Sequence, residues 1–168
     1  MHVLVTASSR HGSTIEIAHV IAGILTDAGL DTTVREPEEV TTLDGVDVVV
    51  IGSGVYMGRW LDPAKSFVER LGPELAARPV WLYSSGPLGE PAKPETEPVD
   101  VAAIRDATKA IDHQLFAGRL VKSELGLGEK LVVRGVRAPY GDFRPWTDIA
   151  AWAQDIARQL AATPAAAV

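Results

Sequence analysis

Short apolar segments alternate with longer segments of helical periodicity along the chain, and this alternation constrains the fold more than any other feature. Val3–Ala7 is apolar apart from Thr6 and Val46–Gly52 is apolar apart from Asp47, as is typical of central strands covered on both faces. Ile17, Ile21 and Ile24 recur on one helical face. We expect strands at 3–7, 32–35, 46–52, 79–84 and 113–118, and helices at 14–28, 62–72, 101–110 and 146–160. This order predicts an α/β fold, a doubly wound five-stranded parallel sheet whose strand order is either 2-1-3-4-5 or that of a nucleotide-binding fold.

The composition of the chain excludes several classes of function. The 168 residues fit one domain, placed at 1–160, followed by a flexible C-terminal tail at 161–168. The chain has no cysteine, which excludes disulfides, thiolate nucleophiles and iron–sulfur clusters. We expect no metal site, because no two histidines have the spacing of metal ligands. The histidines are His2, His11, His19 and His113. A net charge of -6 argues against nucleic-acid binding. No signal peptide or membrane-spanning stretch is evident, so we expect a cytoplasmic protein.

Three loops should hold the ligand, because doubly wound sheets bind ligands at the carboxyl ends of their strands. They are Ser8–Thr14, Ser53–Trp60 and Ser84–Glu90. The first is rich in hydroxyl groups beside Arg10 and His11, and it precedes a helix whose N-terminal N–H groups attract an anion. It therefore predicts a phosphate site. It matches neither the P-loop pattern G-x-x-x-x-G-K-[ST] nor the dinucleotide pattern G-x-G-x-x-G.

The second loop combines glycines with aromatic residues. Gly54 and Gly58 let the backbone approach a flat ligand, and Tyr56 and Trp60 can stack on one. The third loop, at 84–90, offers a hydroxyl-rich strand end before a Gly-Pro turn. No acid–base or nucleophile constellation is evident, so no catalytic residue is assigned.

The first loop resembles the phosphate loop of flavodoxins. The run Ser8-Ser9-Arg10-His11-Gly12-Ser13-Thr14 looks still closer to the S-S-R-[DH]-G-x-T version of the menaquinone-dependent protoporphyrinogen oxidases, a branch of the flavodoxin superfamily. Further marks of the resemblance are Ile51–Gly58, Phe116–Leu120 and Asp142–Trp146. The resemblance implies a flavodoxin-like sheet of order 2-1-3-4-5 and FMN as the cofactor.

It also implies which residues hold FMN. The phosphate contacts would be Ser9, His11, Gly12, Ser13 and Thr14, with Arg10 at the rim. The ring contacts would be Ser53, Gly54, Val55, Tyr56, Met57, Gly58 and Trp60, with Ser84, Ser85 and Gly86 on the pyrimidine side. We expect FMN rather than FAD because the loop closes on a terminal phosphate, while a deazaflavin could use a similar loop.

The expected function is that of an FMN-binding oxidoreductase or electron-transfer protein that meets a redox partner protein or a quinone. One alternative is a menaquinone-dependent protoporphyrinogen IX dehydrogenase. Another is a flavodoxin-fold binding or regulatory domain without flavin.

The segment 119–137 bears on that choice because it is basic in an acidic chain. Its basic residues are Arg119, Lys122, Lys130, Arg134 and Arg137. Helical spacing would place Leu127, Leu131, Val132 and Val136 on an opposing apolar face, which we expect to pack on the domain. We therefore predict no more than a weak, salt-sensitive contact with a membrane surface.

Overall fold

The computed structural model describes residues 1–88, 96–136 and 138–162. Its strands are β1 (His2–Ser8), β2 (Asp31–Arg35), β3 (Val48–Tyr56), β4 (Arg59–Trp60), β5 (Val80–Ser85), β6 (Asp112–Phe116), β7 (Arg119–Leu120) and β8 (Gly141–Asp142). Its helices are α1 (Ser13–Asp27), α2 (Asp62–Leu75), α3 (Val101–Thr108), α4 (Leu127–Val136) and α5 (Trp146–Ala162), with 3-10 turns η1 (Pro37–Glu39) and η2 (Lys122–Glu124).

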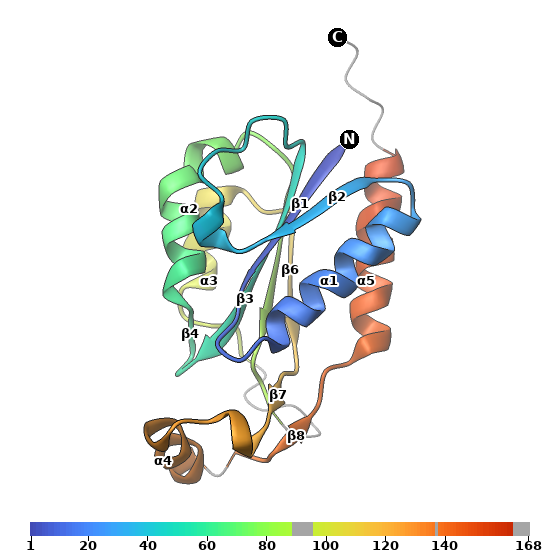
Figure 1. Ribbon diagram of the computed structural model, residues 1–168. Coiled ribbons are helices and arrows are strands. Elements are labelled where there is room, and N and C mark those ends of the chain that lie inside the picture. The colour runs from blue at the N-terminus through green and yellow to red at the C-terminus, as the bar shows by residue number, and fades with distance from the viewer. Residues whose placement is uncertain (89–95, 137, 163–168) are drawn as a thin grey trace.

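The five long strands form one parallel sheet in the order β2-β1-β3-β5-β6. Because β4 is a short added strand, this is the order 2-1-3-4-5 of the parallel strands, and the predicted fold is confirmed. Helices α1 and α5 cover one face of the sheet, and α2 and α3 cover the other (Figure 1).

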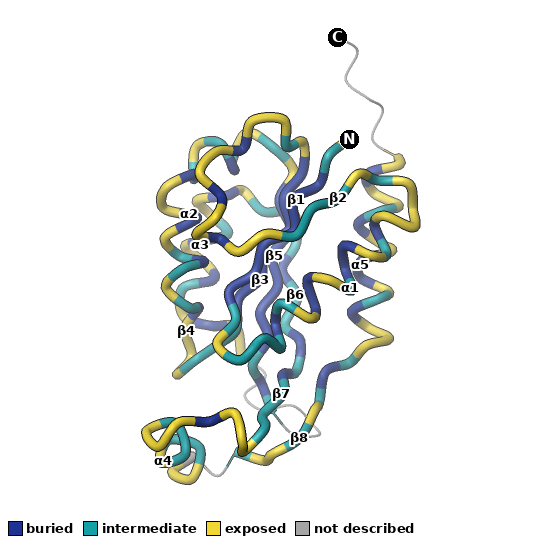
Figure 2. The backbone as a smooth tube through the Cα atoms, viewed as in Figure 1, coloured by how far each residue is buried: buried dark blue, intermediate teal, exposed yellow. Residues whose placement is uncertain are grey.

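Each face of the sheet has its own apolar layer, because successive side chains of a strand point to opposite faces. In β1, Val3 and Val5 pack in the layer beneath α1 and α5, whereas Leu4 packs in the layer beneath α2 and α3. Trp152 of α5 and Phe67 of α2 are large members of the two layers. The central strands are therefore buried on both sides (Figure 2).

The segment 53–60 differs from the loop predicted for it. Strand β3 continues through it to Tyr56 and turns back as β4 in a tight antiparallel hairpin. Met57 and Gly58 form the turn with φ of 51° and 75°, the positive pair that a type I′ hairpin needs. The continuous strand places the backbone of the second loop along the ligand edge of the sheet.

Two helices end later than predicted. Helix α2 bends at Leu71 and adds another turn around Pro73 before it ends at Leu75. Helix α5 reaches Ala162, beyond the domain boundary expected at 160, and residues 163–168 of the predicted tail lie outside the described residues.

The basic segment forms a small excursion at the carboxyl end of the sheet (Figure 1). Strands β7 and β8 pair antiparallel and bracket α4. The expectation that its apolar face packs on the domain is wrong for Leu127 and Leu131, which are 85% and 72% exposed. Val132 and Val133 are instead half-buried, while Arg137 lies outside the described residues.

Gly52 in β3 makes room for the ring of Tyr83 in β5. A Cβ atom built on Gly52 would lie 2.0 Å from Cζ of Tyr83. The buried Tyr83 hydroxyl donates a hydrogen bond of 3.1 Å to the carbonyl oxygen of Thr14, in the first turn of α1. Burial raises the pKa of Tyr83 far above its usual range, so the phenol stays protonated as this donor.

We predict that Gly52→Ala lowers the free energy of unfolding by about 2 kcal/mol, because the added methyl group displaces the Tyr83 ring. The matched control is Gly23→Ala in the exposed interior of α1, where a Cβ meets no atom within 4 Å. That variant should be more stable than the original by about 0.5–1 kcal/mol. Urea unfolding checks both signs, and an unchanged Gly52→Ala midpoint would contradict the close packing.

Candidate functional site

The register of the sheet brings the three predicted loops to one edge. Ser8 of β1 lies opposite Ser53 of β3, and Ser53 lies opposite Ser84 of β5. The three loops therefore start from one row of residues across adjacent strands. This is the carboxyl edge at which doubly wound sheets bind ligands.

A cleft of about 1610 Å³ opens at this edge. Its walls include most of the predicted site residues: Ser9, Arg10, His11, Ser13, Thr14, Gly54, Val55, Tyr56, Met57, Gly58, Ser85 and Gly86. Its other wall comes from the excursion and is mainly apolar, with Leu120, Leu125, Val132, Val133 and Phe143 among its residues. The cleft thus joins a polar, hydroxyl-rich end to an apolar side.

The first loop has the geometry of an anion site. Gly12 precedes α1 with a φ of 80°, which lets the chain turn into the helix. Gly12, the N-cap residue of α1, has no side chain that could cap this helix end. Ser9 Oγ accepts the N–H of Thr14 at 3.1 Å, which leaves its own proton to donate. Free N–H groups and hydroxyls here favour a phosphate.

Arg144, which follows β8, holds the start of α1 through several hydrogen bonds. Its Nη1 donates to the carbonyl oxygen of Ser13 at 3.1 Å and to Glu16 Oε2 at 2.6 Å. Its Nη2 donates to Asp142 Oδ2 at 2.6 Å, and its guanidinium stacks on the ring of Trp146. The hydrogen bond to Asp142 chiefly raises the pKa of Arg144. The sequence marked this segment by resemblance alone, and it contained no signal for the contact with α1.

The first two loops touch each other. The Arg10 guanidinium lies 4.1 Å from the centre of the Tyr56 ring, within cation–π range. Met57 at the hairpin tip is 76% exposed. The hairpin therefore presents an aromatic and a thioether side chain beside the cleft.

The third loop supplies an unpaired polar group and a close backbone approach. Ser85 Oγ is buried on the cleft wall, and it has no hydrogen-bond partner among the described residues. A Cβ atom on Gly86 would lie 2.7 Å from Cβ of Val55, so only glycine fits there. Gly89 and Glu90, the end of the predicted loop, lie outside the described residues. An unpaired buried hydroxyl is costly without a ligand, so Ser85 fits a polar ligand edge.

Three predicted contact residues lie beneath the cleft and do not line it. Trp60 is buried, and its Nε1 donates to Ser84 Oγ at 2.7 Å. Ser84 Oγ in turn lies 2.8 Å from His113 Nε2, whose ring bonds Glu97 through Nδ1 at 2.9 Å. Ser53 Oγ accepts the backbone N–H of Leu61 at 3.0 Å. The Ser84 hydroxyl serves the interior because a buried indole N–H and imidazole need partners, and the Ser53 hydroxyl serves a backbone N–H.

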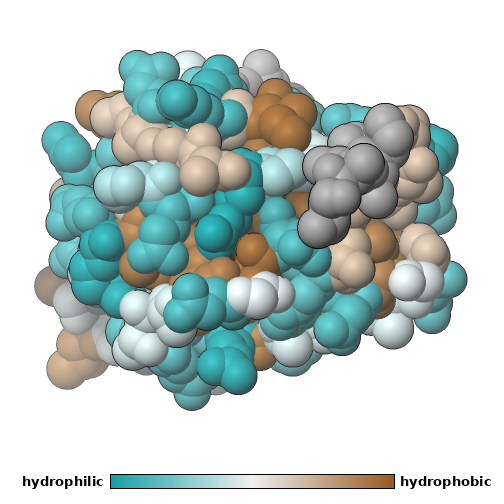
Figure 3. All heavy atoms as spheres, turned by 90° about the horizontal axis from the view of Figure 1, so that it is seen from above, coloured by the Kyte–Doolittle hydropathy of each residue, from teal (hydrophilic) through white to brown (hydrophobic). Residues whose placement is uncertain are grey.

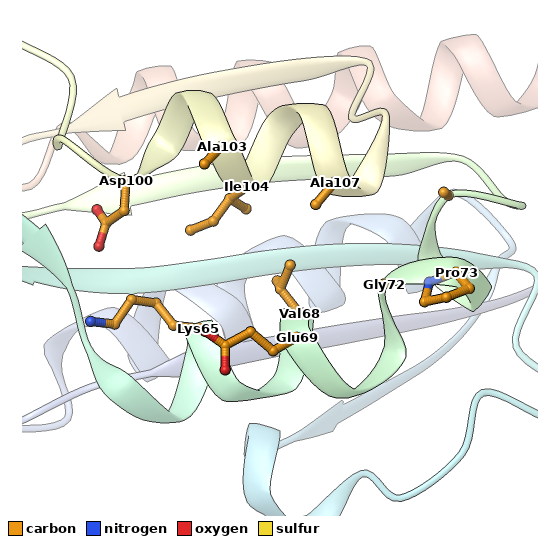
Figure 4. A pocket seen from close by; sticks show the side chains of 10 residues that line it. Lys65, Val68, Glu69, Gly72, Pro73, Asp100, Ala103, Ile104 and Ala107 are labelled. Carbon is orange, nitrogen blue, oxygen red and sulfur yellow. The ribbon is translucent and has the colours of Figure 1, made fainter.

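A second hollow of about 550 Å³ lies between α2 and α3, away from the three loops (Figure 4). Small side chains such as Ala103 and Ala107 leave it open. Two of its charged groups are engaged elsewhere, since Lys65 pairs with Asp62 and Asp100 accepts the N–H of Trp60. We therefore place the functional site at the carboxyl edge.

The opposite end of the molecule, above the amino ends of the strands, has intermingled hydrophilic and apolar side chains (Figure 3). Among the described helices, none combines the length and apolar character that a bilayer crossing needs.

Comparison with known proteins agrees with the fold. Residues 4–144 match a family model described as flavodoxin domain. The chain belongs to this flavodoxin family. Proteins of the family are FMN-binding flavoproteins, so the predicted cofactor is confirmed as that of the family. No curated protein matches the chain.

Several solved structures share the fold. A flavodoxin from the domain Archaea has 14% identity and a TM-score of 0.66, covering 96% of this chain and 99% of that chain. A flavodoxin from Streptococcus pneumoniae has 22% identity and a TM-score of 0.58, covering 96% and 97%. The rubredoxin oxygen:oxidoreductase of Desulfovibrio gigas has 15% identity and a TM-score of 0.65, covering 96% of this chain but 36% of that one.

We predict that His113 gives the fold an acid-sensitive stability. Burial lowers the pKa of His113 below the ordinary 6.5 and outweighs the opposing effect of Glu97. The folded state therefore favours neutral imidazole, and the free energy of unfolding should fall as the pH drops below about 6.5. The slope from one proton reaches at most about 1.4 kcal/mol per pH unit.

Urea unfolding between pH 7 and 5 measures this effect, and His113→Gln should flatten the profile. The window lies above the range in which the carboxylates with lowered pKa titrate, namely Asp62, Asp112, Glu129 and Asp142. His19→Gln, which removes an exposed histidine of α1, is the control and should leave the profile unchanged. Equal profiles for the original and His113→Gln would refute the assignment.

Proposed function

We propose that this protein carries FMN noncovalently in the cleft at the carboxyl edge and transfers electrons through it. The observation that carries the proposal is the meeting of a helix N-terminus with glycine at its N-cap, a hydroxyl-rich loop and an unpaired buried Ser85 hydroxyl on one cleft. Bound FMN supplies hydride or single-electron transfer at its N5.

Different residues would contact the phosphate and the ring of FMN. Ser9, Ser13 and Thr14 would donate to the phosphate at the start of α1, which Tyr83 and Arg144 hold in place. The backbone along the hairpin and at Gly86 would meet the ring. The protein would supply orientation and electrostatics, while the chemistry belongs to the flavin.

The proposal assigns fewer side chains to the flavin ring than the sequence predicted. Tyr56 and Met57 on the hairpin and Ser85 on the third loop reach the cleft wall. Trp60 and Ser84 would act through the buried network that supports this wall.

We predict that the protein without cofactor binds FMN in clear preference to FAD, because the loop closes on a terminal phosphate. Thr14→Ala should lower the affinity for FMN about tenfold, since hydrogen bonds to charged groups contribute about 1.5–3 kcal/mol. Thr26→Ala, at the far end of the same helix, is the control and should bind as the original does. Riboflavin, which lacks the phosphate, should bind Thr14→Ala and the original alike.

Flavin fluorescence titration measures these affinities, and mass spectrometry of the released cofactor distinguishes FMN from a deazaflavin. Equal binding of FMN and FAD would contradict the phosphate assignment. A protein that binds no flavin would support the alternative of a binding or regulatory domain.

The outer face of α4 favours a second candidate, a menaquinone-dependent protoporphyrinogen IX dehydrogenase at the membrane surface. Leu127 and Leu131 are exposed there, and Lys130 and Arg134 form no ion pair with any described residue. In the first candidate, this face would meet a redox partner protein in the cytoplasm.

We predict weak, salt-sensitive binding to anionic vesicles, since each basic residue near the surface contributes about 1 kcal/mol. Co-sedimentation at low and high salt checks this, with Arg134→Gln expected to bind less. Arg35→Gln, on the edge strand β2, is the control. Binding that survives high salt would favour the quinone-linked enzyme. Absence of binding at low salt would leave an acidic protein partner as the use of these charges.

A further inference from the structure

Helix α4 reaches back to the phosphate loop through one carboxylate. Glu129 Oε1 lies 3.0 Å from His11 Nε2 and 3.3 Å from Arg10 Nη1. The Glu129 side chain is only 20% exposed, and the next turn of α4 places Val132 and Val133 on the cleft wall. The helix is thus joined to the loop by a polar contact at the end where the phosphate would bind.

Glu129 carries its charge at neutral pH. The N–H of Gly126, which donates to Glu129 Oε2 at 2.9 Å, chiefly lowers the pKa of this carboxyl, and His11 and Arg10 lower it further. An anion of the chain therefore already occupies the two basic side chains of the first loop.

We propose that Glu129 is a specificity-determining residue that competes with the ligand's phosphate for Arg10 and His11. The inference rests on the proposed function, since it concerns the same loop. A flavin with a phosphate must displace the carboxylate or bind against its repulsion, whereas a flavin without one meets no such opposition. Glu129 thereby lowers the preference of the site for the phosphorylated ligand.

The contact is suited to displacement. Leu127 and Leu131, on either side of Glu129 along α4, are exposed. The neutral donors Ser9, Ser13 and Thr14 remain for the phosphate whether or not Glu129 moves. Release of the carboxylate would free α4 from the loop, so phosphate binding and the position of α4 are coupled.

The test compares FMN with riboflavin in Glu129→Gln. Glutamine removes the charge but keeps an oxygen that can accept the N–H of Gly126, so the start of α4 is retained. Glu124→Gln is the matched control, because Glu124 lies in the same segment and pairs with Arg119 outside the phosphate loop. Both variants change the net charge equally.

We expect Glu129→Gln to bind FMN about fivefold more tightly at low salt, within the range of a partly exposed ion pair. The gain should shrink at high salt, because salt screens the competing charges. Riboflavin affinity should stay unchanged in this variant, and Glu124→Gln should match the original with both flavins. Fluorescence titration measures the ratio of the two affinities.

Hydrogen exchange of the α4 amides gives an independent readout of the coupling. FMN should speed exchange in α4 of the original protein, whereas riboflavin should not. An unchanged FMN-to-riboflavin ratio in Glu129→Gln would overturn the inference while leaving the proposed function intact. If the original protein binds neither flavin, both proposals fall together.

Discussion

The parallel register of β1, β3 and β5 is the constraint on which the rest of the site depends. Backbone hydrogen bonds align Ser8, Ser53 and Ser84 across the three strands, and each of the three loops starts from that row. A shift of one residue in β3 would turn its buried side chains to the opposite layers and move the hairpin relative to the first loop. The two apolar layers therefore hold the geometry of the cleft as well as the stability of the sheet.

The first turn of α1 is fixed by contacts from distant parts of the chain. The Tyr83 hydroxyl reaches the carbonyl of Thr14 through the space left by Gly52, and Arg144 reaches the carbonyl of Ser13 from beyond β8. Both donors bond carbonyl oxygens of the turn, while Ser9 Oγ accepts the N–H of Thr14 from the loop side. The start of α1, where the proposed phosphate site lies, is thus held by contacts from residues that are distant in the sequence.

The sequence predicted the five parallel strands and the three loops, because strand periodicity and loop composition are local properties. The order of the strands came from the resemblance to flavodoxins, since the periodicity alone left two orders open. It did not predict the β3–β4 hairpin, since glycines and aromatics fit a tight turn as well as a loop. It also assigned Trp60 to the ligand, whereas Trp60 pairs with Ser84, 24 residues away. The contacts of Arg144 with α1 and of Glu129 with His11 span 128 and 118 residues, and no local pattern encodes them.

The cations near the cleft fall into two groups with different physical roles. Arg10, Arg119 and Arg144 all form ion pairs with carboxylates of the chain. These pairs link α1, the excursion and the first loop. Lys122, Lys130 and Arg134 have no ion-pair partner among the described residues, and they lie on the excursion. Unpaired charges act over about 10 Å at ordinary salt, whereas paired ones largely cancel. The unpaired positive charge beside the cleft therefore lies on the excursion, next to the apolar side of the cleft, whereas Arg10 at the first loop is paired with Glu129. An anionic ligand at the first loop and an anionic partner at the excursion would therefore meet different groups of cations.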